Sequence, residues 1–222
     1  MDYSELIKQV KPSIALIAAL DSQNQLLGTG TGFIFGDKTI LVTCNHVVKG
    51  SSSILIKFPG SEFVGGKVVL RDDEHDLALL QFSNTERNPL QLGDLSAISE
   101  GMPIVFSGYP FSSHDLTTHQ GIISAIAKDA TGMVSYLIDG TVNSGNSGCP
   151  LMDTSGKVIG VVNAKRRQRN DLLEKVEKMS VGALSLHSVD IVEIYQALAS
   201  NIQLGVGYAV PAQYIPEHKE IK

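Results

Sequence analysis

A serine flanked by glycines stands at residues 145–148 (GNSG), just before a short apolar stretch. Glycine allows the backbone to turn tightly and to approach a ligand closely, so a serine hydroxyl in this setting is well placed for chemistry. A free hydroxyl is a poor nucleophile at neutral pH and needs a base, which in turn needs a group that orients it. Ser147 is therefore the candidate nucleophile, and its partners must come from elsewhere in the chain.

His46 and Asp76 are the candidate base and the candidate orienting acid. His46 lies where an apolar run meets a polar turn, and Asp76 opens the next apolar run. Two rival acids, Asp72 and Asp73, belong to a charged turn and have no apolar run that would bury them. Five rival histidines occur in surroundings unlike those of His46: His75, His114, His119, His187 and His218.

Taken singly, each of the three residues has a purely structural explanation, as part of a turn, as a hydrogen-bonded histidine or as a cap. Together they are more specific, because each adjoins a strand-like segment and their order along the chain is His, Asp, Ser. This is the order of the chymotrypsin-type enzymes. In those enzymes the serine attacks a carbonyl, the histidine takes its proton, and a buried aspartate orients the histidine.

Several stretches around these residues resemble the conserved blocks of trypsin-fold serine proteases, and most of all those of the HtrA/Deg type. The blocks are residues 28–35 (GTGTGFIF), 43–48 (TCNHVV), 75–80 (HDLALL) and 145–150 (GNSGCP). Shorter similarities occur at residues 108–111, 121–125 and 207–211. The resemblance covers roughly residues 5–165 and 203–216. It departs from the family at Cys149, where glycine is usual.

The resemblance implies an all-β fold of two six-stranded antiparallel barrels in a single trypsin-like domain. Residues 1–92 would form the first lobe with His46 and Asp76, and residues 93–222 the second lobe with Ser147. Many short strand-like runs between glycine turns favour an all-β class independently. The strands are expected at residues 14–20, 25–29, 30–35, 39–43, 53–58, 66–70 and 77–82, then at 103–108, 116–127, 134–139, 157–164 and 205–210.

The resemblance also implies how the site would bind a substrate. The backbone N–H groups of Gly145 and Ser147 would form the oxyanion hole that stabilises developing negative charge. Thr141 lies where a trypsin carries the aspartate that selects basic residues, so a small or aliphatic residue before the scissile bond is expected. The implied substrate-binding residues are Thr141 and Ser144 on one wall of the primary pocket, and Asn163, Ala164 and Lys165 on the edge that pairs with the substrate backbone.

The segment of residues 165–203 breaks the family pattern. Its apolar spacing predicts two amphipathic helices, at residues 170–179 and 190–199, which form a helical insertion in the second lobe. These helices pack onto the second barrel or offer a surface to an activating protein partner. The segment starts with the basic run 165–169, which is either a solvated loop or a site that favours acidic substrate residues or nucleic acid.

The N-terminal segment predicts a short helix over residues 4–10, capped by Ser4 and ended by Pro12. The segment lacks the basic, apolar and small-residue regions of a secretory signal, so a cytoplasmic protein is expected. The two cysteines, Cys44 and Cys149, are too few for a disulfide framework. They are expected to be small buried side chains in a reducing compartment, with a redox switch as the alternative.

Composition narrows the classes of function. The 222 residues have a formal net charge of −5 and are 43% hydrophobic and 18% charged, as is ordinary for a globular chain. This charge gives no general reason to expect nucleic acid or a membrane as partner. No cluster of residues has metal-ligand spacing, so neither a metal nor another cofactor is expected.

Three functions fit these residues. The first is a serine endopeptidase that cleaves a protein or peptide substrate, latent until a partner activates it, with no room after residue 216 for the PDZ domain usual in HtrA proteases. The second is a trypsin-fold protein that binds or chaperones other proteins, its oxyanion loop at residues 143–146 unassembled. The third is an esterase, which is disfavoured because no strand-to-helix elbow is predicted around Ser147. Assembly into a homo-oligomer is left open.

Overall fold

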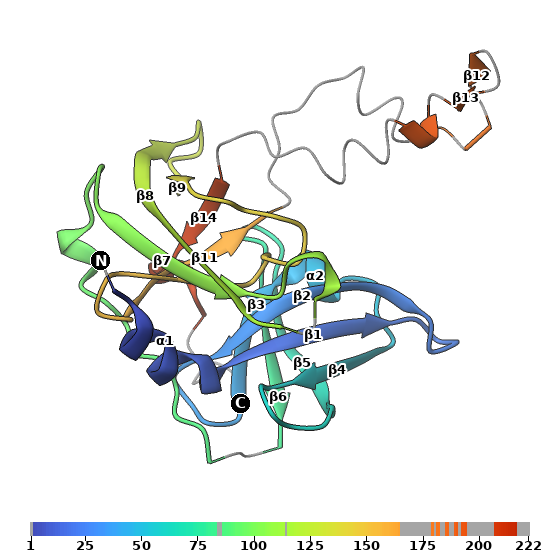
Figure 1. Cartoon of the computed structure of the whole chain (residues 1–222), viewed down its shortest axis with the longest axis horizontal. Helices are drawn as coiled ribbons and strands as arrows, with labels where there is room; N and C mark the ends of the chain where they lie inside the picture. Colours follow the sequence, from blue (N-terminus) through green and yellow to red (C-terminus); the bar gives the residue numbers. More distant parts are fainter. Residues whose placement is uncertain are drawn as a thin grey trace.

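The computed structural model of the chain describes residues 2–83, 86–113, 115–164 and 207–216, with a few short pieces between residues 179 and 194. It contains two closed antiparallel barrels of six strands each (Figure 1). The predicted all-β fold of two six-stranded barrels is therefore confirmed. Within these residues, no helix combines the length and the apolar character that crossing a bilayer requires.

The first barrel carries the candidate base and acid, and its spatial order is β1-β2-β3-β6-β5-β4. Its strands are β1 (Ile14–Leu20), β2 (Leu26–Ile34), β3 (Ile40–Cys44), β4 (Ser53–Lys57), β5 (Val64–Asp72) and β6 (Leu77–Phe82). Every residue of β3 is buried and β6 exposes only Gln81, so both strands have nearly continuous apolar sequences. Antiparallel pairing sets the last residue of β3, Cys44, opposite the first residue of β6, Leu77. The segments with His46 and Asp76 therefore lie at the same end of the barrel.

The second barrel carries the candidate nucleophile, and its spatial order is β10-β11-β14-β9-β8-β7. Its strands are β7 (Pro103–Gly108), β8 (Thr117–Lys128), β9 (Val134–Asp139), β10 (Pro150–Met152), β11 (Val158–Asn163) and β14 (Gly207–Pro211). Ser147 lies in the loop that enters β10. The Gly148 N–H donates to the Val162 carbonyl at 2.8 Å, and the Val162 N–H donates to the Cys149 carbonyl at 2.9 Å. These bonds fix the end of the serine loop to the barrel wall.

Short helices precede, connect and follow the strands, and the first of them differs in part from its prediction. They are α1 (Ser4–Val10), η1 (Lys11–Ser13), α2 (Asn45–Val48), η2 (Leu95–Ala97), η3 (Pro110–Ser112) and η4 (Ala212–Tyr214). The predicted helix over residues 4–10 is confirmed, but Ser4 is its first residue rather than its cap. Asp2 accepts hydrogen bonds from the N–H and the hydroxyl of Ser4, at 2.9 and 2.7 Å. Pro12 does not end the helical turns, because η1 continues them through Ser13.

The strands predicted for the two barrels are present, with two differences. The strands expected at residues 25–29 and 30–35 are one continuous strand, β2, because no turn separates them. Strand β10 has only three residues and was not predicted. The helices predicted at residues 170–179 and 190–199 lie almost entirely outside the described residues. The described pieces of that region include a small two-stranded sheet of β12 (Ser185–Leu186) and β13 (Val189–Asp190).

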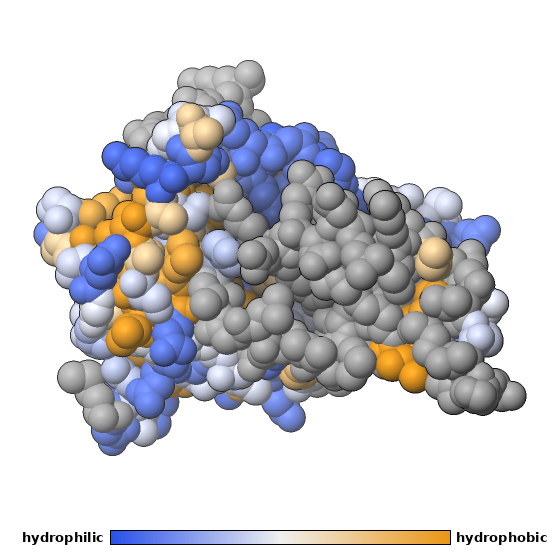
Figure 2. All heavy atoms as spheres, turned by 90° about the horizontal axis from the view of Figure 1, so that it is seen from above, coloured by the Kyte–Doolittle hydropathy of each residue, from blue (hydrophilic) through white to orange (hydrophobic). Residues whose placement is uncertain are grey.

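Strand β8 leaves part of its apolar side chains on the surface. Of its twelve residues only Ile123 is buried, while Ile122 and Ile126 are 41% and 37% exposed. Figure 2 shows the molecule from above, and apolar side chains gather on the left of the face that it displays, beside hydrophilic ones. The second barrel therefore presents some of its hydrophobic residues to solvent rather than to its core.

A fully buried threonine of β2, Thr31, joins the two barrels. Its hydroxyl donates to the Gly145 carbonyl at 2.8 Å and accepts from the Tyr109 N–H at 3.0 Å. Its own N–H donates to the Ser147 carbonyl at 2.9 Å. Glycine is required at residue 148, because a Cβ there would lie 2.0 Å from the Thr31 carbonyl oxygen and because φ is +87°. One side chain of the first barrel thus fixes the serine loop of the second.

Replacing this hydroxyl should destabilise the fold. Thr31→Val keeps the side-chain shape but leaves the Gly145 carbonyl and the Tyr109 N–H unpaired in the interior, at a cost of about 1–3 kcal/mol. Thr31→Ser keeps the hydroxyl and loses one methyl group, at a cost of about 1 kcal/mol. Urea unfolding of both variants measures the difference. A Thr31→Val protein as stable as Thr31→Ser would contradict the role of this hydroxyl.

Candidate active site

His46 and Asp76 are in direct contact, as the sequence predicted from their surroundings. His46 lies on α2, the single turn that follows β3, and its Nδ1 is 2.6 Å from Asp76 Oδ2. The His46 N–H donates to Asp76 Oδ1 at 2.8 Å. The Asn45 N–H donates to the Asp76 carbonyl at 2.9 Å. The acid is therefore bonded to His46 through both carboxylate oxygens and to Asn45 through its backbone carbonyl.

Ser147 completes a continuous line of hydrogen bonds. Its Oγ lies 2.9 Å from His46 Nε2, and the Ala164 N–H donates to the same oxygen at 3.2 Å. An ionised carboxylate can only accept, so Nδ1 of His46 carries the ring proton toward Asp76. Nε2 is then left as an acceptor for the Ser147 hydroxyl. This tautomer is the one that a base needs in order to remove the serine proton.

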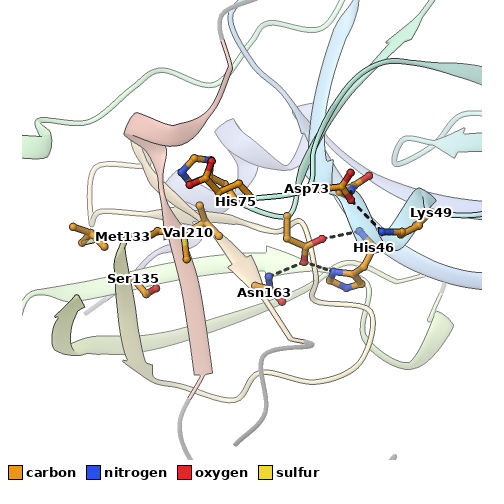
Figure 3. A pocket seen from close by; sticks show the side chains of 12 residues that line it. His46, Lys49, Asp73, His75, Met133, Ser135, Asn163 and Val210 are labelled. Carbon is orange, nitrogen blue, oxygen red and sulfur yellow. Dashed lines mark hydrogen bonds and ion pairs between the residues drawn. The ribbon is translucent and has the colours of Figure 1, made fainter. Parts of the chain in front are cut away.

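The carboxylate of Asp76 is held in its charged form. Burial favours the neutral acid, but the hydrogen bonds and the charge of His46, with a further hydrogen bond from Asn163, hold the pKa of Asp76 below its ordinary value. The amide Nδ2 of Asn163 donates to Asp76 Oδ2 at 2.9 Å. Dashed lines in Figure 3 mark the bonds that reach this carboxylate from the His46 and Asn163 sides. The first barrel supplies His46, and the second supplies Asn163.

The loop before Ser147 leaves two N–H groups available. The Phe111 N–H donates to the Ser144 carbonyl at 2.8 Å, and a trans peptide points its N–H the opposite way, so the Gly145 N–H is directed away from Phe111. Among the described residues, the N–H groups of Gly145 and Ser147 have no backbone acceptor. Gly145 has φ of +93°, and a Cβ there would lie 2.2 Å from the Tyr109 carbonyl oxygen. Only glycine fits this position.

A model of the trypsin-like peptidase domain family matches residues 30–161, which is more than half of the chain. The chain belongs to this family. It is 32% identical over 200 residues to the serine protease Do-like HtrA of Lactobacillus helveticus, covering 85% of this chain and 48% of that protein. It is 31% identical over 191 residues to the protein of the same description in Bacillus subtilis (strain 168), covering 73% of this chain and 42% of that protein.

Solved structures agree with the fold of this trypsin-like peptidase domain. The HtrA-type protease AlgW with tripeptide superposes with a TM-score of 0.72 at 23% identity, over 96% of this chain and 60% of that chain. At this level of identity the likeness shows the fold alone. The chain spans between 30% and 48% of the length of the first curated relatives that it matches.

The residues expected at the substrate have different surroundings in the peptidase domain. Thr141 and Ser144 are exposed, whereas Asn163 is buried with its amide on Asp76. The sequence had suggested neither this contact nor the bond from the Ala164 N–H to the serine. Both donors lie at the end of β11. The Ala164 donor is a backbone N–H, which every residue type except proline carries, so residue type gives no signal for it. Lys165 and the rest of the basic run 165–169 lie outside the described residues.

The rival acids, and the two rival histidines in the described part of the domain, bind other side chains. Asp72 binds the His75 ring at 2.7 Å, and Asp73 binds Lys49 at 3.1 Å, so neither takes the place of Asp76. His119 bonds to a threonine hydroxyl, and burial lowers its pKa. The other rival histidines, His114, His187 and His218, lie outside the described residues.

The two cysteines are free and fully buried. Burial raises the pKa of Cys44 well above its ordinary value and that of Cys149 to about 12, so both remain neutral thiols. Atoms of Cys44, His46 and Asp76 that could ligate a metal lie within 4.8 Å of one another. However, the Cys44 thiol donates to the Val162 carbonyl, and the ring and the carboxylate bind each other. A metal would require a thiolate and would have to break that pair.

A pocket of about 350 Å³ adjoins the His46–Asp76 pair on the side drawn in Figure 3. It lies between the turn that carries Asp76 and the second barrel. Its walls are polar near the first barrel and include apolar side chains near the second. The lining residues are Asn45, His46, Lys49, Asp73, Glu74, His75, Asp76, Met133, Val134, Ser135, Asn163 and Val210.

The depressed pKa of Asp76 predicts a pH-dependent contribution to stability. A carboxylate with a lower pKa in the folded chain stabilises the fold above its ordinary pKa, near 4, and loses this effect as pH falls through the folded value. Asp76→Asn cannot titrate. The free energy of unfolding of the wild type should therefore fall relative to that of Asp76→Asn as pH drops from about 5 to about 2. Urea titrations at several pH values measure this, and parallel profiles would contradict it.

Proposed function

We propose that this domain is a serine endopeptidase that cleaves peptide bonds through an acyl-enzyme. Ser147 is the nucleophile and His46 is the general base. Asp76 orients the histidine and stabilises its protonated form. The observation that carries the proposal is the unbroken hydrogen-bond line from Asp76 through both ring nitrogens of His46 to the Ser147 hydroxyl. The names of the curated relatives, serine protease Do-like HtrA, support the same activity.

The chemistry follows from these positions. The Ser147 oxygen attacks the peptide carbonyl while its proton moves to Nε2 of His46, and Asp76 stabilises the imidazolium that forms. The ring then gives the proton to the leaving amine, and the C–N bond breaks to leave an ester on Ser147. A water molecule deprotonated by the same nitrogen attacks the ester, and the acid product departs as the serine regains its proton.

Negative charge on the former carbonyl oxygen needs donors that are already in place. The N–H groups of Gly145 and Ser147 are proposed as these donors. The Phe111–Ser144 hydrogen bond orients the Gly145 peptide, and the bonds of the serine loop to Thr31 and Val162 support the Ser147 peptide. Each such donor typically lowers the barrier by about 3–4 kcal/mol. With this arrangement, the described loop favours catalysis over the alternative of a binding protein whose oxyanion loop is unassembled.

The primary pocket is proposed to take a small or aliphatic side chain. Thr141 is uncharged, and a Cβ on Gly207 would lie 2.4 Å from a methyl group of Val142. Val142 thus packs directly on Gly207 of β14, and neither it nor Thr141 supplies a carboxylate that would select basic residues. An activating partner at residues 165–203 and a cytoplasmic location stay predictions from the sequence, and assembly into a homo-oligomer stays open.

Removing the serine hydroxyl tests the proposed activity. Ser147→Ala should lose labelling by a fluorophosphonate probe and lower the rate of peptide cleavage by a factor on the order of 10⁴ or more, because the nucleophile is gone. Its unfolding midpoint should stay close to that of the wild type. Ser155→Ala, in the exposed turn between β10 and β11, is the matched control and should label normally. Wild-type protein that is folded yet unlabelled would favour the binding function instead.

Cleavage-site sequencing of a mixed peptide library tests the primary pocket. The wild type should prefer small or aliphatic residues over lysine and arginine before the scissile bond by about tenfold or more in kcat/KM. Thr141→Asp adds a carboxylate to the wall and should raise cleavage after basic residues. Wild-type cleavage mainly after lysine or arginine would show that the pocket is built differently.

A further inference from the structure

The turn that carries Asp76 has an uncommon backbone conformation. Asp76 has φ of +56°, in the left-handed region that few residues other than glycine adopt, although aspartate and asparagine do so more often than most. Such a conformation persists only where the surrounding structure holds it. Hydrogen bonds to His46 and Asn45 hold Asp76 itself. The preceding residue, His75, determines how the chain enters the turn.

His75 is fixed by its own set of contacts. Its N–H donates to Asp72 Oδ1 at 2.9 Å, and its Nδ1 lies 2.7 Å from Asp72 Oδ2. Its ring stacks on the ring of Tyr214, with centroids 4.2 Å apart and planes 20° apart. The side chains of His75 and Asp72 are only 19% and 21% exposed. The stack is therefore mostly shielded from water and lies one residue from Asp76.

Tyr214 belongs to the second barrel. It ends η4, the short helix that follows β14, and its hydroxyl accepts a hydrogen bond from the Val134 N–H at the start of β9, at 3.0 Å. The backbone of Tyr214 is thus placed by η4 after β14, and its hydroxyl is fixed by β9. Figure 3 shows His75 beside the ribbon that follows β14, across the pocket from Met133 and Ser135.

The stack therefore crosses between the barrels on one side of Asp76. On the other side, Asn163 of the second barrel donates to the carboxylate. Because Ser147 also comes from the second barrel, a shift of the Asp76 turn relative to that barrel would misalign the carboxylate, the imidazole and the hydroxyl together. We infer that Tyr214, acting through His75, is a positioning residue that aligns Asp76 and His46 with Ser147, an inference that rests on the proposed peptidase function.

This role predicts a loss in the chemical step rather than in substrate binding. Tyr214→Leu removes the stack and should lower kcat for a peptide substrate, and the rate of fluorophosphonate labelling, by about ten- to a hundredfold with KM little changed. Tyr214→Phe keeps the ring and should restore kcat to within a few-fold. Tyr3→Leu, which removes a tyrosine packed on the first barrel at α1, is the matched control and should keep the wild-type kcat.

A double-mutant cycle shows whether the effect runs through the stack. His75→Ala should lower kcat by the same factor as Tyr214→Leu, and the double variant should lose no more than either single variant. If Tyr214→Leu does not fold, His75→Ala decides, because it leaves the second barrel intact. Wild-type kcat in folded His75→Ala, or losses that multiply in the double variant, would overturn the inference. A wild-type protein without labelling would instead overturn the peptidase function itself.

Discussion

The hydrogen bonds of Thr31 to the second barrel are the constraint on which the site depends. Each barrel closes its own sheet, so nothing in the strand pairing alone fixes one barrel against the other. The Thr31 side chain and N–H reach the carbonyls of Gly145 and Ser147, which places the serine loop directly on β2, the neighbour of the strand that leads to His46. A shape-preserving change that removed this hydroxyl would leave buried groups unpaired, so the joint is polar and specific rather than merely hydrophobic.

The strand register of the first barrel determines the positions of His46 and Asp76. The second barrel contributes to their environment. The pairing of β3 with β6 brings the segments of His46 and Asp76 to one end. Burial there would by itself favour a neutral Asp76, and the bonds from His46 and Asn163 reverse that preference. Because Asn163 comes from β11, part of this electrostatic support is present only when the barrels are docked. The charge state of the acid and the alignment of the nucleophile thus depend on the same interface.

The sequence was sufficient for the elements with strong local signals. The many short apolar runs, among them β1, β3 and β6, predicted an all-β class, and the resemblance to trypsin-fold proteases implied the two barrels. The glycine-flanked Ser147, with His46 and Asp76 beside strand-like runs, predicted the three residues that the structure brings together. It was insufficient where tertiary contacts decide. Strand β10 is too short for a pattern, the bond from the Ala164 N–H carries no residue preference, and the amide of Asn163 could not be assigned to Asp76 without the β11 register. Serine is a typical cap residue, which predicts Ser4 as the cap, but the helix begins at Ser4 and the carboxylate of Asp2 accepts from its N–H.

The buried polar side chains are all hydrogen-bonded, and this limits how the site can vary. No buried side-chain nitrogen or oxygen in the described part of the chain lacks a hydrogen-bond partner. The thiols of Cys44 and Cys149 stay neutral, whereas the half-buried carboxylate of Asp76 is held in its charged form. The donors that stabilise this charge, on His46 and Asn163, belong to two barrels. A small rotation between the barrels would therefore weaken the base and displace the nucleophile together.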